Sequence, residues 1–196
     1  MLVDEACGQS PCFFLSLFYH ILTHYLRQSV LGHAVGATVY GTSRTPNKLE
    51  RAKVLGLEVG LSDKNFAAEI QQLTAGAGVN IILDFVGAPY MEQNMQVLAP
   101  WGRIVFLATL GGKDAQVDLS AVMSKRIQIR GCTLRTRTLE EKLAVTRRFA
   151  TQVVPLLANA TVMPIVEEVF SWHDIAQAHT AMAANRNFGK LILRID

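Results

Sequence analysis

The chain has 196 residues, half of them hydrophobic, and a formal net charge of only +3. This length allows one ample hydrophobic core, the apolar content excludes global disorder, and the small charge gives no case for binding nucleic acid or acidic membranes. Cys7, Cys12 and Cys132 show neither zinc-site spacing nor the pattern of a disulfide framework, so we expect a reducing, cytoplasmic setting.

Residues 1–31 form an atypical apolar segment without a regular pattern of strands and helices. Its longest apolar run, 12–22, is shorter than the roughly 18 residues that a membrane-spanning helix needs. Acidic residues precede this run where a secretory signal would carry positive charge. His20 and His24 lie four positions apart, but no further ligand completes a metal site, so we interpret the run as an amphipathic helix. We expect this segment to contribute little to the fold.

From Gly32 onward, short apolar strands alternate with helices. The pattern predicts strands at 37–41, 58–61, 79–86 and 103–108, and helices over 46–55, 66–73 and 91–98. Alternation of this kind, with short loops, is typical of a doubly wound parallel sheet that has helices on both faces. The predicted fold class is therefore α/β.

The run 79–86 is continuously apolar up to Asp84 and is followed by Gly87, as in a strand buried on both faces of a sheet. We interpret Asp84 as a structural residue that accepts a backbone hydrogen bond. Ligands of parallel sheets lie just beyond the carboxyl ends of the strands. Val86, Gly87 and Ala88 therefore mark an expected ligand site, and an ordinary strand-ending turn is the alternative.

The second half of the chain predicts a strand at 127–131, a long helix over 139–157, a strand over 163–170 and a last strand at 191–193. Ser171, with Asp174 three residues on, fits the start of a helix. We interpret His179, on the apolar stripe of that helix, as a core histidine rather than a catalytic one. The basic stretch from Lys125 to Arg137 is interpreted as a solvated strand face, with a subunit edge as the alternative.

Several stretches together carry a family resemblance: GATVYGTSR at 36–44, KLERAKVLG at 48–56, GAGVNIILDFVG at 76–87, GRIVFL at 102–107 and NFGK at 187–190. Each is weak alone, but their order and spacing are specific. From about Gly32 to its end, the chain resembles the quinone oxidoreductase-like, zinc-free branch of the medium-chain dehydrogenase/reductase superfamily. The resemblance implies NADPH-dependent reduction of a quinone or enone by hydride transfer from the nicotinamide to an electron-poor acceptor.

The resemblance also implies a domain plan. Residues 32–160 correspond to an NADP-binding Rossmann-type domain, and 161–196 to a C-terminal strand, helix and strand that return to a substrate domain. Most of that substrate domain has no counterpart here, and neither does the glycine-rich turn of the first βα unit. We therefore expect a Rossmann-type sheet that is truncated at its first βα unit.

The expected cofactor contacts follow from the loop positions. The loop after the second strand carries Ser43, Arg44 and Lys48 and no acid, which favours the 2′-phosphate of NADP over the ribose hydroxyls of NAD. A solvated basic loop is the alternative reading. By the resemblance, the remaining contacts lie along the nicotinamide or touch the cofactor elsewhere: Val86, Gly87, Ala88, Leu107, Ala108, Thr109, Leu110 and Asn187.

No residue of the chain is a credible catalytic acid or base. Hydride transfer does not require one here, because the nicotinamide carries the chemistry and the protein positions cofactor and substrate. The resemblance places a dimer strand at about Gln128 to Thr133, so we expect a homodimer, a small quinone or enone as substrate, and no nucleic-acid or membrane partner. The alternative is a catalytically inactive fragment that acts as a dimerising or nucleotide-binding module.

Overall fold

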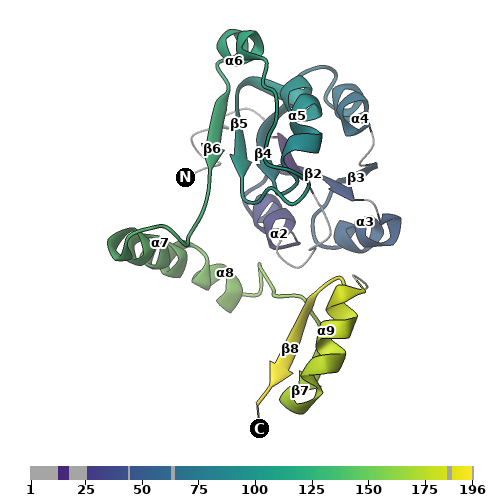
Figure 1. Cartoon of the computed structure of the whole chain (residues 1–196), viewed down its shortest axis with the longest axis vertical. Helices are drawn as coiled ribbons and strands as arrows, with labels where there is room; N and C mark the ends of the chain where they lie inside the picture. The colour runs from purple at the N-terminus through teal and green to yellow at the C-terminus, as the bar shows by residue number, and fades with distance from the viewer. Residues whose placement is uncertain (1–12, 18–25, 44, 63–64, 185–186, 196) are drawn as a thin grey trace.

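The centre of the molecule is a six-stranded parallel sheet (Figure 1). The computed structural model describes residues 13–17, 26–43, 45–62, 65–184 and 187–195. Across the sheet the strands run in the order β3-β2-β1-β4-β5-β6. Their bounds are Phe13–Leu17 for β1, Thr38–Ser43 for β2, Val59–Ser62 for β3, Val79–Asp84 for β4, Leu98–Phe106 for β5 and Gln128–Gly131 for β6.

Hydrophobic residues are buried on both faces of this sheet. In β4, Ile81 packs into a cluster with Val39 and Leu49, whereas its neighbour Ile82 packs into a larger cluster that includes Phe66. This opposite placement of successive residues is expected for a strand covered by helices on both sides. The helices of this part are α2 (Leu26–Ala34), α3 (Pro46–Lys53), α4 (Phe66–Leu73), the short 3-10 helix η2 (Ala88–Tyr90), α5 (Met91–Val97) and α6 (Leu119–Lys125). The predicted α/β class with a doubly wound parallel sheet is thereby confirmed.

Strand β1 corrects the expectation for the N-terminal segment. It lies between β2 and β4 and runs parallel to both, with Leu15 opposite Tyr40 on one side and Ile82 on the other. The first strand and the helix α2 are thus present. Residues 18–25 between them, which include His20 and His24, lie outside the described residues. A run of five residues, four of them apolar, cannot be assigned to strand or helix by periodicity. Residues 13–17 form a strand in the structure because they pair with β2 on one side and β4 on the other.

The remaining elements lie beside and below the sheet in Figure 1. They are α7 (Leu139–Gln152), α8 (Val154–Ala158), β7 (Val166–Ser171), the 3-10 helix η3 (Trp172–Asp174), α9 (Ile175–Ala183) and β8 (Lys190–Arg194). Strands β7 and β8 form a separate parallel pair, with Val169 opposite Ile192. The predicted single helix over 139–157 is therefore divided at Val153, and the strand predicted from 163 begins at Val166.

Two local predictions for this region have different outcomes. The Ser171 hydroxyl accepts a hydrogen bond from the His173 N–H, so the capping role of Ser171 is confirmed. His179 is exposed, although its neighbour Ala178 is buried, so its interpretation as a core histidine is wrong. Among the described residues, α9 packs mainly on β7, β8 and η3, so the stripe that it buries is narrow. None of the helices that the structure describes has the length and apolar character to cross a membrane.

Candidate functional site

The loops that follow β4 and β5 are joined to each other by main-chain hydrogen bonds. Leu107 N–H donates to the Asp84 carbonyl at 2.8 Å, and Leu110 N–H donates to the Phe85 carbonyl at 3.0 Å. Further along, Gly111 N–H reaches the Val86 carbonyl at 2.8 Å. The structure therefore brings together two groups of predicted cofactor contacts, 86–88 and 107–110, at one edge of the sheet.

Asp84 fixes the conformation of the first of these loops. Its buried carboxylate accepts the N–H groups of Val86 at 2.6 Å and Gly87 at 2.9 Å, and the Asn94 side-chain amide at 2.8 Å. Burial raises the pKa of Asp84, and these three hydrogen bonds act in the opposite direction. The interpretation of Asp84 as a structural residue with backbone hydrogen bonds is confirmed.

Glycine is required at position 87 by the approach of the two loops. Gly87 has φ +84°, and a Cβ atom there would lie 2.4 Å from the Gly112 carbonyl oxygen. Ala88 N–H donates to that same oxygen at 3.0 Å. The small residues here therefore hold the two loops together, as the reading of an ordinary strand-ending turn requires, and their contact with a ligand stays a prediction.

A shallow groove continues this edge past β6. Its lining combines apolar side chains with hydroxyls, a thiol and one cation: Phe85, Leu107, Cys132, Thr133, Leu134, Arg135 and Thr136. Arg137 holds the far wall, because its Nε donates to the Thr133 carbonyl at 3.0 Å. The sequence analysis did not select 132–136 as a site, although the loop after a parallel strand is where ligand residues are expected.

The opposite end of the edge carries the residues predicted to bind a phosphate. Ser43 ends β2 and is buried, with its Oγ accepting the Thr45 N–H at 3.1 Å. Lys48 lies in the first turn of α3 and is only 7% exposed. Burial lowers the pKa of Lys48, and the nearby Glu167 carboxylate counteracts this effect. Arg44 lies outside the described residues.

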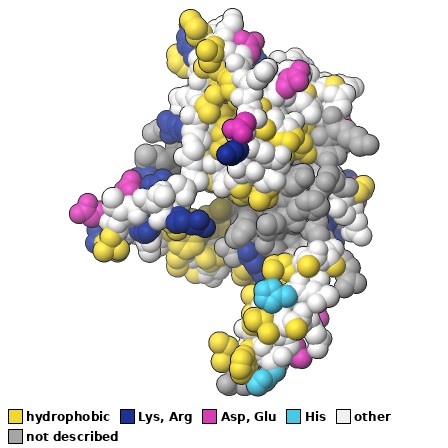
Figure 2. Space-filling model, viewed as in Figure 1, with side chains coloured by type: hydrophobic (Ala, Val, Ile, Leu, Met, Phe, Trp, Pro, Cys, Tyr) yellow, Lys and Arg dark blue, Asp and Glu magenta, His cyan; other side chains and the backbone are white. Residues whose placement is uncertain are grey.

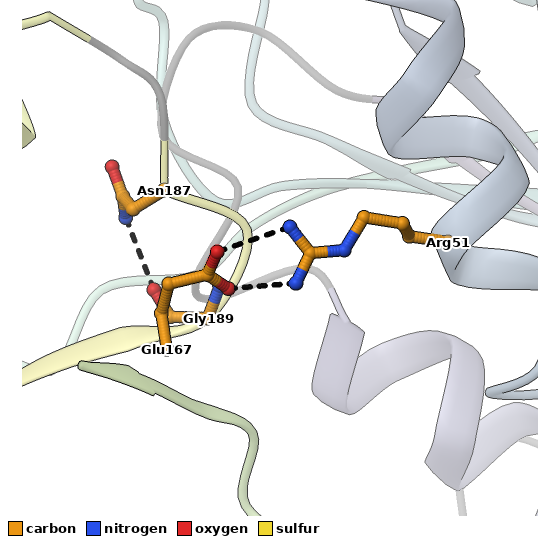
Figure 3. A network of polar contacts seen from close by, with 4 residues as sticks. All are labelled: Arg51, Glu167, Asn187 and Gly189. Atoms are coloured by element: carbon orange, nitrogen blue, oxygen red, sulfur yellow. Dashed lines mark hydrogen bonds and ion pairs between the residues drawn. The ribbon is translucent and has the colours of Figure 1, made fainter.

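Glu167 is a residue of this end that the sequence analysis missed. Its carboxylate accepts two hydrogen bonds from the Arg51 guanidinium, at 3.0 and 2.8 Å, although the two residues are 116 positions apart (Figure 3). Glu167 Oε2 also accepts the Gly189 N–H at 3.1 Å, and the Arg51 guanidinium lies 4.3 Å from the centre of the Phe188 ring. Strand β7 and the turn before β8 are thus attached to α3.

Asn187 lies in this same turn, as Figure 3 shows. Its side-chain amide donates to the Gly189 carbonyl at 3.0 Å, and the residue is half-buried. The structure therefore places Asn187 beside the contact between Arg51 and Glu167. It does not bring the residue into hydrogen-bond contact with the loops at 86–88 or 107–110.

The carboxyl ends of the parallel strands bring these parts to a common edge. β2 ends at Ser43, β4 ends at Asp84 and β5 ends at Phe106. From β2 to β5 the sheet takes three inter-strand steps, roughly 14 Å at about 4.8 Å per step. The strand order changes direction between β1 and β4, and ligands of doubly wound sheets bind at such a switch point. An extended dinucleotide fits this edge, with cationic groups at the β2 end and small or apolar residues at the β4 and β5 end.

The basic stretch has a structural use that the sequence analysis did not predict. The Lys125 ammonium donates to the carbonyls of Met95, Gln96 and Leu98, at 3.1, 3.2 and 2.9 Å, and so caps the end of α5. A purely solvated role is therefore wrong for Lys125. Arg130 and Arg135 are exposed, and Figure 2 shows basic side chains gathered over α7 and hydrophobic ones over α6.

The fold and the common edge define a nucleotide-binding α/β protein, and comparisons with known proteins give the family. A family model described as "Zinc-binding dehydrogenase" matches residues 30–151, more than half of the chain. The chain belongs to this family, and its similarity to quinone oxidoreductases of the medium-chain dehydrogenase/reductase superfamily is confirmed.

Individual relatives give the extent of the match. A phenolphthiocerol/phthiocerol polyketide synthase subunit of Mycobacterium tuberculosis is 31% identical over 165 residues, which are 82% of this chain and 7% of that protein. A quinone oxidoreductase of Pseudomonas aeruginosa is 26% identical over 164 residues, 82% of this chain and 50% of that protein. The chain therefore spans half of this relative and a small part of the polyketide synthase.

A solved mycobacterial protein in complex with NADPH shares the fold at a TM-score of 0.76 and 21% identity, over 97% of this chain and 60% of that one.

The name of the family, "Zinc-binding dehydrogenase", raises the question of a zinc site. Over the ranges that the structure covers, no three His, Cys, Asp or Glu side chains lie together as a metal ion requires. The described residues thus do not fit a zinc site, whereas the common edge fits a nicotinamide dinucleotide.

Proposed function

We propose that the chain is the cofactor-binding part of an NADPH-dependent oxidoreductase that reduces a quinone or an enone. The observation that carries this proposal is the joining of the loops 84–88 and 107–112 by main-chain hydrogen bonds at the same sheet edge as Ser43 and Lys48. The membership of the dehydrogenase family supports it. The nicotinamide supplies the hydride when it is bound, and the protein positions it.

The residues of the edge have different tasks in this proposal. Val86, Gly87 and Ala88 let the cofactor approach the main chain, and the residues at 107–110 lie along the nicotinamide. Lys48 binds the 2′-phosphate as a point charge. The groove beyond them, with Phe85, Leu107 and Leu134 as its apolar part, receives a planar electron-poor acceptor. Among the lining residues Arg135 supplies positive charge that polarises a carbonyl oxygen.

The test compares two glycines that both have a positive φ near +80°. Gly87→Ala places a methyl group against the Gly112 carbonyl, whereas Gly76→Ala has a similar φ of +82° and only the end of the Gln71 side chain 4.0 Å away. We expect Gly87→Ala to lose at least tenfold in NADPH affinity, measured by calorimetry, and Gly76→Ala to bind as the wild type does. Equal affinity in all three proteins, or no binding by the wild type, would contradict the proposal.

Reduction itself is measured by loss of NADPH absorbance with a small quinone and with an enone. NADPH binding without turnover would favour the alternative, a nucleotide-binding module without catalysis. Quinones react with thiolates, and Cys132 is exposed in the groove, so turnover is measured without added thiol and Cys132→Ser serves as a control.

We further propose a homodimer that pairs through β6, over Gln128 to Thr133. β6 is the last strand in the sheet order, and Ile129 in it is 43% exposed. Exposed edge strands commonly pair with another chain. Ile129→Lys should shift the protein from dimer to monomer in analytical ultracentrifugation. A wild-type monomer at high concentration would reject the pairing.

A further inference from the structure

An acid occupies the phosphate end of the edge, although none is present in the loop that follows β2. Glu167 comes from β7, and its carboxylate accepts hydrogen bonds from both terminal nitrogens of the Arg51 guanidinium. An acid near this position favours the ribose hydroxyls of NAD and repels a 2′-phosphate. The fold therefore places a carboxylate from a distant strand where it opposes the binding of a 2′-phosphate.

Lys48 and Arg51 form one cationic pair on α3. They are three positions apart on the same helix, and neighbours at this spacing lie on one face. The charges of Arg51 and Glu167 both act on Lys48, with opposite sign. The side chains of Arg51 and Glu167 are 44% and 24% exposed, so a ligand from solvent can reach them. Glu167 thus partly neutralises the positive charge of Lys48 and Arg51.

We propose that Glu167 is a positioning residue that sets cofactor selectivity: by holding Arg51, it weakens the attraction of Lys48 and Arg51 for a 2′-phosphate and limits the preference for NADPH over NADH. The inference rests on the proposed function for the identity of the cofactor. A phosphate must share the guanidinium with the carboxylate and lies near its negative charge. NADH carries no 2′-phosphate and meets neither obstacle.

Glu167→Gln tests the charge while it keeps the shape of the side chain. We expect the ratio of the NADH and NADPH dissociation constants to rise about fivefold, the order expected for one partly screened charge at close range. Arg51→Ala should lower the same ratio, because it removes a cation and leaves Glu167 unpaired. The double variant should recover part of that loss, since the two residues act as one unit.

Two controls separate charge from structure. Glu50→Gln removes the same charge from α3 at an exposed residue that pairs with Lys53 at 2.8 Å. Phe188→Leu removes the ring under Arg51 without a change of charge. Both controls should leave the ratio unchanged. If Glu167→Gln weakens NADH and NADPH equally, its role is only to attach β7 to α3 and the inference is overturned.

A probe without nicotinamide keeps this test independent of the reductase activity. Adenosine 2′,5′-bisphosphate and 5′-AMP differ by the 2′-phosphate alone. Calorimetry with the full chain should show the bisphosphate binding more tightly, and Glu167→Gln should widen the difference about fivefold. If the protein does not bind NADPH, yet Glu167→Gln still widens the difference between the bisphosphate and 5′-AMP, the proposed function fails and the role of Glu167 stands. If the wild type does not distinguish the two nucleotides, the inference is rejected.

Discussion

The two ends of the cofactor edge are built by different forces. At the β4 and β5 end, main-chain hydrogen bonds and one buried carboxylate hold loops that are close in sequence. At the β2 end, Arg51 from α3 pairs with Glu167 from β7. These two residues are 116 positions apart in the sequence, and their side chains are partly exposed to solvent. A main-chain site depends on backbone conformation and a few glycines, whereas a charged site can be tuned by a single substitution. In the proposed function, the main-chain end thus fixes where the cofactor binds, and the charged end decides which cofactor binds.

The largest expected effect comes from the strand that supports both ends. β1 lies between β2 and β4, so Leu15→Pro removes a hydrogen-bond donor inside the sheet. We expect a loss of about 3 kcal/mol or more in the free energy of unfolding, measured in urea. Ile129→Pro in the edge strand β6 is the matched control and should cost clearly less. An equal cost would mean that β1 is not a central strand.

The main-chain end is tested by Asp84→Ala. The change leaves the N–H groups of Val86 and Gly87 and the Asn94 amide buried without their acceptor. The expected loss is about 2–3 kcal/mol in the free energy of unfolding. Asp118→Ala removes a carboxylate that also accepts two backbone N–H groups, at the exposed start of α6, and should cost about 1 kcal/mol. A smaller loss at Asp84 than at Asp118 would contradict this account.

The charged end is tested by Lys48→Ala. We expect NADPH to lose about 1–2 kcal/mol more binding free energy than NADH, because one charge-assisted contact to the 2′-phosphate disappears. Lys53→Ala, on the same helix but exposed and paired with Glu50, serves as control and should affect neither cofactor. Calorimetric titrations with both cofactors measure the difference. Equal losses with NADPH and NADH would remove the phosphate role from Lys48.

The smallest effect concerns the pH dependence of the contact between α3 and β7. The hydrogen bonds from Arg51 hold the pKa of Glu167 below its ordinary value. A carboxyl with a lowered pKa in the folded state contributes stability above its unfolded pKa and loses it as pH falls through the folded pKa. The gap in unfolding free energy between wild type and Glu167→Gln should thus be constant at neutral pH and shrink in acid. A gap that stays constant in acid would show that the charge of Glu167 does not stabilise the fold.

Much of the fold is determined by the sequence alone. The apolar runs at 37–41, 79–86 and 103–108 are strands because each is short, β-branched or aliphatic, and bounded by small residues. Asp84 and Gly87 are also predictable, since a polar residue at the end of a buried strand must be satisfied by the nearest main chain. These features depend on neighbours within a few residues, and such neighbours are visible in the sequence.

Tertiary structure decides the rest. The run at 13–17 pairs as a strand with β2 and β4 on its two sides, and His179 lies on an exposed part of α9. Lys125 caps α5 through space, and Glu167 reaches Arg51 from β7. Charges interact over distance in space rather than along the chain. For this reason the loop after β2 indicates a preference for NADP, but only the folded protein shows the acid that opposes it.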